Sequence, residues 1–159
     1  MKGSLCHEYE TGIPAEEVWQ VYGTLRLGQL VQQLLPHLFH KVEVVEGDGG
    51  VGTILCVTFP SGKGMRYYKE KFIKVDNENY IKEARGLEGG ALDAGFYSYL
   101  VRFEIMLKDD NSSTIRSTIE YEADDKCQVD NSLISTDLVA AMADATTKYL
   151  KEQKNQVEG

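Results

Sequence analysis

Cysteine and long apolar runs are scarce in this sequence, and each scarcity excludes a class of protein. The 159 residues include only three cysteines. Cys6, Cys56 and Cys127 are too widely spaced for a disulfide framework or a zinc motif. No apolar run approaches the ~20 residues that span a bilayer. We therefore expect a cytoplasmic protein that has no signal peptide before its first strand and no membrane as partner.

Positive charge is also in short supply. The chain has 17 lysines and arginines against 25 aspartates and glutamates, which gives a formal net charge of −8. Nucleic-acid phosphates and anionic membrane surfaces both attract clustered basic residues, so we predict neither as a partner. The histidines His7, His37 and His40 have no ligand spacing with cysteines or acids. We accordingly predict no metal and no cofactor.

Hydrophobic patterning predicts a single domain over residues 1–159, with one strand, two short helices, six strands and one long helix. The expected strands are residues 5–11, 40–46, 54–59, two within 66–90, 96–107 and 114–122; the expected helices are residues 15–22, 26–35 and 130–154, with Asp130 as candidate N-cap. Segregated strands and helices indicate an α+β fold. A seven-stranded antiparallel sheet that curls around one long helix is too wide to be filled by side chains alone, so we expect an internal cavity.

A glycine-rich stretch, GDGGVGT at residues 47–53, satisfies the G-x-G-x-x-G pattern of dinucleotide-binding proteins. That motif must open a helix whose N-terminus holds a pyrophosphate. Here the next residues, 54–59, read as another strand. We therefore interpret the stretch as a turn between antiparallel strands.

The central hairpin, residues 66–90, is the stretch most informative about function. Its two strands flank a polar turn at residues 76–79, and neither face of residues 66–71 is clearly apolar. An ionisable side chain therefore points inward, where it must be paired or line a cavity. We predict that Tyr68, Glu70 and Lys82 face a cavity. The alternative is a solvated cross-strand pair of Glu70 and Lys82, which contributes under about 1 kcal/mol.

The element order and the glycine loop at residues 47–53 resemble the plant pathogenesis-related class ten proteins, which share the Bet v 1 fold, over essentially the whole chain. More narrowly, residues 68–72 (YKEKF), 88–90 (EGG) and 140–145 (AAMADA) resemble the norcoclaurine synthases, and residues 1–4 (MKGS), 19–22 (WQVY) and 24–27 (TLRL) the norbelladine synthases. The resemblance implies a Bet v 1-like helix-grip fold. It also implies an alkaloid-pathway enzyme that condenses dopamine or tyramine with an aromatic aldehyde through an imine.

The same resemblance implies catalytic roles for Tyr68, Glu70 and Lys82. The norcoclaurine synthase aspartate falls on Val101, which can neither transfer a proton nor hold an ammonium. This departure is shared with norbelladine synthase-like sequences, which also have an aliphatic residue there. Whether the product closes a ring therefore stays open at this point.

These residue types suit imine chemistry. A carboxylic acid near neutrality can protonate a departing hydroxyl, provided that burial raises the pKa of Glu70. Lys82 can hold a phenolate oxygen, and Tyr68 can donate a hydrogen bond. A close Glu70–Lys82 ion pair would instead keep both groups charged, and the sequence leaves the two alternatives open. The expected substrate-binding walls are Phe72, Tyr97, Tyr99, Val101 and Met142.

Structural roles compete with functional ones for several of these residues. Tyr97 and Tyr99 fit a role in the core as well as a ligand contact, and Met142, at helical spacing, fits the core first and the cavity wall second.

The runner-up function is a non-catalytic carrier of a hydrophobic plant metabolite or hormone. A nuclease activity is disfavoured by the net charge. We expect small-molecule aromatic amine and aldehyde partners and a monomer or weak homodimer.

Overall fold

The structure, a computed structural model, describes residues 1–61, 66–125 and 134–158. The strands in these ranges are β1 (Lys2–Glu10), β2 (Lys41–Glu46), β3 (Ile54–Thr58), β4 (Tyr67–Asp76), β5 (Ile81–Gly89), β6 (Phe96–Asp109) and β7 (Ser112–Ala123). The helices are α1 (Ala15–Tyr22), α2 (Arg26–Leu34), the short 3-10 helix η1 (Gly90–Ala94) and α3 (Asp137–Glu158). The predicted order of strands and helices is confirmed, and with it the α+β class.

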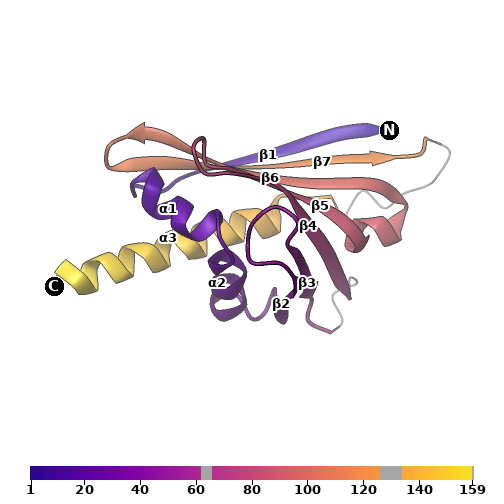
Figure 1. Ribbon diagram of the computed structural model, residues 1–159, viewed down its shortest axis with the longest axis horizontal. Helices are drawn as coiled ribbons and strands as arrows, with labels where there is room; N and C mark the ends of the chain where they lie inside the picture. The colour runs from indigo at the N-terminus through magenta and orange to yellow at the C-terminus, as the bar shows by residue number, and fades with distance from the viewer. Residues whose placement is uncertain (62–65, 126–133, 159) are drawn as a thin grey trace.

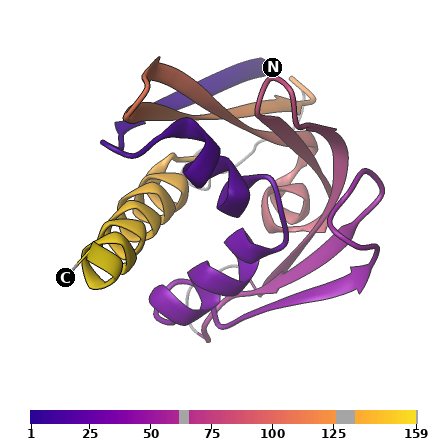
Figure 2. The same cartoon turned by 60° about the vertical axis from the view of Figure 1, so that its left-hand side comes forward.

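All seven strands form one antiparallel sheet in the order β1-β7-β6-β5-β4-β3-β2. The sheet curves over α3, as Figure 1 shows. In Figure 2 the helices α1, α2 and α3 all lie on the concave side of the sheet. Alternate residues of β7, including Ile115, Ser117 and Ile119, are buried on this inner face, as a sheet with one solvated face requires.

Helix α1 is anchored to the turn between β4 and β5. It follows Pro14 and carries Glu16 and Glu17 in its first turn, where the helix dipole stabilises acidic side chains. The indole Nε1 of Trp19 donates a hydrogen bond of 2.9 Å to Asn77 Oδ1. The Trp19 ring also stacks on Tyr80 with 5.4 Å between centroids. These contacts tie α1 to the turn end of the central hairpin.

The glycine-rich loop at residues 47–53 connects β2 to β3 and opens no helix. Its backbone extends the pairing of β3 with β4, because Gly52 N–H donates to the Phe72 carbonyl and Phe72 N–H donates to the Thr53 carbonyl. The interpretation as a turn between antiparallel strands is confirmed, and the dinucleotide motif is excluded by its context.

Helix α3 begins later than predicted. The expected start and N-cap, Asp130, lies outside the described residues, but residues 134–136 are described and are not helical. The Ser135 hydroxyl accepts a hydrogen bond from the Asp137 N–H. A serine oxygen of this kind satisfies a backbone donor that has no intrahelical partner, so the first turn forms at Asp137. Ile134 precedes the helix and packs beside Ala91 and Phe96.

Cys6 and Cys56 are free thiols, and Cys127 lies outside the described residues. In the part of the chain that the structure describes, no helix has both the length and the apolar character that a membrane span requires.

Candidate active site

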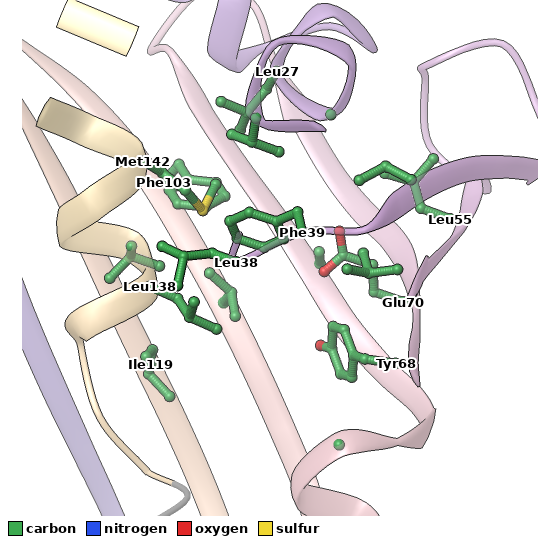
Figure 3. A pocket seen from close by; sticks show the side chains of 18 of the residues that line it. Leu27, Leu38, Phe39, Leu55, Tyr68, Glu70, Phe103, Ile119, Leu138 and Met142 are labelled. Atoms are coloured by element: carbon green, nitrogen blue, oxygen red, sulfur yellow. The ribbon is translucent and has the colours of Figure 1, made fainter. Parts of the chain in front are cut away.

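A cavity of about 360 Å³ lies between the concave face of the sheet and helices α2 and α3. Figure 3 shows its walls, in which apolar side chains predominate. The labelled apolar residues of the walls are Leu27, Leu38, Phe39, Leu55, Phe103, Ile119, Leu138 and Met142. The expected internal cavity is therefore present, with a volume in the range of small-molecule sites.

Strand β4 supplies the polar groups of one wall. Tyr68, Glu70 and Phe72 alternate along it and all line the cavity, as period two predicts. Figure 3 shows the Glu70 carboxyl group and the Tyr68 hydroxyl projecting from β4 into the same space. A register shift between Phe72 and Lys74 marks a bulge, which leaves Ile73 exposed while Phe72 and Val75 both pack inward.

Lys82 comes from the neighbouring strand β5 and is only 3% exposed. It lies opposite Val75 of β4 and Phe103 of β6, whereas Glu70 lies opposite Gly86. The two rows are therefore four positions apart on β5, about 13 Å of strand. The row between them contains Phe72 and Ala84. Lys82 and Glu70 share the cavity, but Phe72 occupies the position between them on the sheet.

The sequence leaves open whether Glu70 and Lys82 form a close ion pair or have their pKa values shifted by burial, and the structure decides between the two. Burial lowers the pKa of Lys82 to about 8, and the charge of Glu70 only partly offsets this effect. Burial likewise raises the pKa of Glu70, against the opposing effect of the Lys82 charge. Glu70 retains some accessible surface because it borders the cavity. Desolvation thus has a larger effect on the pKa of each group than the charge of the other group has. The alternative interpretation, a solvated cross-strand pair of Glu70 and Lys82, is therefore wrong.

Two phenol side chains, Tyr68 and Tyr99, lie near Glu70. The buried Tyr68 hydroxyl has no hydrogen-bond partner in the described ranges, and Tyr68 meets Tyr99 edge to face at 5.8 Å. Burial and the nearby Glu70 charge raise the pKa of Tyr68 well above its usual value and that of Tyr99 to about 12. Both phenols therefore stay protonated near neutral pH and can donate hydrogen bonds into the cavity.

Glycines form the slot in which the Tyr68 ring lies. A Cβ atom at Gly90, whose φ is +54°, would come within 2.9 Å of Tyr68 Cδ2. A Cβ atom at Gly86 would lie 3.1 Å from Tyr68 Cε2. Gly86 within β5 and Gly90 at the start of η1 are thus needed for the approach of an aromatic ring, not only for a turn.

The predicted wall residues divide into two groups. Phe72, Tyr99, Val101 and Met142 all line the cavity. Val101 is 8% exposed and lies opposite Ala84, so its aliphatic side chain gives this part of the wall no proton donor and no charge.

Tyr97 was predicted as a wall residue of the cavity, and this prediction is wrong. Its side chain is 65% exposed and does not line the cavity. A register shift between Phe96 and Ser98 places a bulge at Tyr97, which turns this side chain to the outer face. There it hydrogen-bonds Glu122, an interaction that raises the pKa of Tyr97.

Several wall residues escaped the sequence-based prediction. Phe39 and Leu38 come from the loop before β2, where no periodicity indicates which side chain is buried. Phe103 belongs to the alternating face of β6 that also carries Tyr99 and Val101, so the pattern could have found it. Across the described ranges, no group of three or more His, Cys, Asp or Glu side chains is placed to hold a metal ion.

The sequence is similar to a known protein family and to two kinds of plant synthase. Residues 1–156 match the sequence model described as the pathogenesis-related protein Bet v 1 family. The chain is 52% identical over 156 residues to norbelladine synthase of Narcissus pseudonarcissus, which covers 98% of this chain and 96% of that protein. It is 40% identical over 151 residues to S-norcoclaurine synthase of Thalictrum flavum subsp. glaucum, which covers 94% of this chain and 71% of that protein.

A solved structure shares the fold at similar identity. Norcoclaurine synthase from Thalictrum flavum, in complex with dopamine and hydroxybenzaldehyde, superposes with a TM-score of 0.86 at 39% identity. The superposition covers 96% of this chain and 88% of that chain.

Proposed function

The chain belongs to the Bet v 1 family of pathogenesis-related proteins, and from this premise we propose that it condenses a phenethylamine with an aromatic aldehyde through an imine. The similarity to a norbelladine synthase and to norcoclaurine synthases supports this reaction class. The observation that carries the proposal is the burial of Glu70 and Lys82, held apart, in one apolar cavity. Dopamine and tyramine are the proposed amines.

Glu70 acts as the proton carrier of the condensation. The amine nitrogen attacks the aldehyde carbon, and after transfer of one N–H proton to the oxygen a neutral carbinolamine results. The protonated Glu70 carboxyl group gives its proton to the hydroxyl, which leaves as water while the C=N bond forms. The Glu70 carboxylate then takes the remaining proton from the iminium nitrogen, so that the neutral imine and the initial acid are regenerated. The raised pKa of Glu70 supports this role.

Lys82 and Tyr68 orient the substrates in this proposal. The Lys82 ammonium holds a substrate phenol or phenolate oxygen, and its pKa of about 8 also leaves a neutral fraction that can accept a phenol proton. The Tyr68 hydroxyl has no protein partner among the described residues and donates to the aldehyde oxygen as negative charge develops there. Phe72, Tyr99, Val101 and Met142 provide the walls for two aromatic rings.

The test is a substrate-pair screen with the purified protein. Tyramine and dopamine are each incubated with 3,4-dihydroxybenzaldehyde and with 4-hydroxyphenylacetaldehyde. Borohydride traps imines as secondary amines, and chiral chromatography detects a ring-closed product. We expect turnover above buffer for at least one pair. Buffer-level rates for every pair would reject the proposal.

A carrier function is the second candidate, and the predominantly apolar cavity with Val101 in its wall favours it. A carrier binds an aromatic plant metabolite and releases it unchanged. Equilibrium dialysis followed by mass spectrometry separates the two functions, because a carrier returns the ligand intact whereas an enzyme converts it. Tight binding without conversion of any pair would favour the carrier.

We also propose a cytoplasmic location and a monomer or weak homodimer. The free thiols of Cys6 and Cys56 are consistent with a reducing compartment. Cell fractionation tests the location, and sedimentation across a concentration series tests the oligomeric state.

A further inference from the structure

The Lys82 amine is buried without a conventional partner. In the part of the chain that the structure describes, no hydrogen bond or ion pair to its Nζ atom is present. Its neighbours are two ring faces, with Nζ 4.5 Å from the Phe72 ring centroid and 5.9 Å from that of Phe103. A desolvated ammonium is costly unless something compensates it, and the electron-rich face of an aromatic ring is such a partner.

The backbone fixes both rings beside this amine. Phe103 lies directly opposite Lys82 on β6, and Phe72 occupies the next row of the inner face on β4. Phe72 is 1% exposed, and Phe103 is 6% exposed and meets Tyr22 in an edge contact with 5.2 Å between ring centroids. Neither ring is free to turn away, so the arrangement is a built feature of the sheet and not a chance contact of a mobile side chain.

We propose that Phe72 and Phe103 form a two-ring cation site that holds the Lys82 amine in its ammonium form and directs it into the cavity. The two phenylalanines are positioning residues, because they act through Lys82. Phe72 is the stronger partner, since its ring is the nearer one. The site also keeps the ammonium away from Glu70, so the cavity retains a proton-donating acid and a cation that are not neutralised by each other.

Other charged and titratable groups face the same space and must be considered with Lys82. They are Glu70 and Tyr68 from β4, Tyr99 from β6, His37 from the loop after α2 and Asp137 from the start of α3. Glu70 is the one whose charge acts on Lys82 with a resolved effect, and burial outweighs it. Removal of the ring attraction should therefore be visible as a further fall in the pKa of Lys82.

The experiment replaces Phe72 by mono-, di- and trifluorophenylalanine in the full-length protein. Fluorine withdraws electrons from the ring face while the ring volume changes little. The readout is the pKa of Lys82 in the ligand-free protein, from NMR titration of ¹³Cε-labelled lysine, assigned by Lys82→Arg. We expect a stepwise fall that reaches about one pKa unit in the trifluoro variant. The same series at Phe103 should give a smaller fall.

Phe96 provides the matched control. It is 2% exposed and belongs to a separate cluster with Ala91 and Ala123, where it meets Tyr121 edge to face. Its fluorination should leave the Lys82 titration unchanged. A Lys82 pKa that is insensitive to fluorination at Phe72, or that shifts equally for Phe96, would overturn the inference. Phe72→Leu removes the ring altogether and should lower the pKa of Lys82 at least as far.

The kinetic consequence rests on the proposed function, but the titration does not. If the enzyme turns over, the limb of the kcat/KM pH profile that reports Lys82 should move with the fluorine count. A graded Lys82 titration without turnover of any substrate pair would uphold the cation site and reject the proposed chemistry. Turnover together with a Lys82 pKa that does not change with the fluorine count would uphold the proposed chemistry and reject the cation site.

Discussion

The Nζ atom of Lys82 lies over the ring face of Phe72, 4.5 Å from the ring centroid, although Glu70 lines the same cavity. The register of the central hairpin explains this preference, because Glu70 and Lys82 lie opposite different residues of their partner strands, with the row of Phe72 between them. An acid and an amine that formed a close pair would neutralise each other, and neither would titrate near neutral pH. Their separation gives the cavity one group that can donate a proton and one that can hold an oxyanion.

Replacement of Glu70 by glutamine should remove the proton carrier without disturbing the fold. We expect turnover to fall about 10²–10⁴-fold, because a positioned acid typically contributes that much. Wild-type turnover should also decline as pH rises through the raised pKa of Glu70, since only the protonated form donates. Steady-state kinetics against pH and circular dichroism provide the measurements.

Glu88→Gln is the matched control for this substitution. Glu88 lies on β5 of the same hairpin but is half exposed and pairs with Lys69. It should retain wild-type activity. Unchanged turnover in Glu70→Gln, with the fold intact, would remove Glu70 from the mechanism.

The buried amine of Lys82 should make the protein less stable at neutral pH than its methionine variant. The folded pKa is about 8 and the ordinary value 10.5, so between these values the unfolded state binds more protons than the folded state. Stability from this group therefore rises with pH through that window. Below pH 8, burial of the charge costs on the order of 3 kcal/mol. Lys82→Met should be more stable by up to this amount at pH 7.

Urea unfolding at several pH values measures this difference. The advantage of Lys82→Met should shrink as pH rises from 8 towards 10.5. The exposed Lys71, on β4, serves as control through Lys71→Met, for which we expect little change at any pH. A Lys82→Met variant that is no more stable than wild type at pH 7 would show that the buried amine is fully compensated.

Gly90→Ala should displace the Tyr68 ring. The added Cβ atom would lie 2.9 Å from Tyr68 Cδ2, so the ring must move or the backbone must shift. We expect at least a tenfold loss of turnover, since small displacements of a positioning group are costly. Gly52→Ala is the control, because Gly52 also has a positive φ but no atom lies within 4 Å of the added Cβ. Both variants should lose some stability, but only Gly90→Ala should lose turnover. Equal turnover in the two variants would contradict the inference that Gly90 leaves the room that the Tyr68 ring needs.

Side-chain alternation was sufficient to place the central residues of the cavity but not to describe their relationship. Tyr68, Glu70 and Lys82 were predicted to face a cavity because neither face of residues 66–71 is clearly apolar, and all three line the cavity. The bulges were not predictable, because a bulge is an extra backbone residue with no side-chain pattern of its own. One bulge turned Tyr97 to the outer face.

Residues outside regular strands were the least predictable part of the site. Phe39 reaches the cavity from a loop, and loops carry no periodicity from which burial could be inferred. The balance between burial and pairing at Glu70 and Lys82 was equally out of reach. It depends on hairpin register and on the Phe72 ring, and both are properties of the folded sheet.

Val101→Asp should change how the reaction ends. After water leaves, the intermediate is an iminium cation, and the aliphatic Val101 wall offers it no counter-charge. Loss of the N–H proton to Glu70, which releases a neutral imine, is therefore favoured in the wild type. An aspartate at this position would stabilise the cation, since an opposite charge within ~4–6 Å favours the charged form. A longer-lived iminium gives an electron-rich dopamine ring time to attack, so the ring-closed fraction should rise.

Val101→Asn separates charge from shape in this prediction. Asparagine has nearly the same volume as aspartate and no charge, so it should leave the ratio of products at the wild-type value. Chiral chromatography measures the cyclic product, and borohydride trapping measures the open imine. Because a buried carboxylate without a full set of partners is destabilising, Val101→Asp should also unfold at lower urea than wild type. If the aspartate and asparagine variants gave the same product ratio, counter-charge at this position would not decide between release of the imine and closure of the ring.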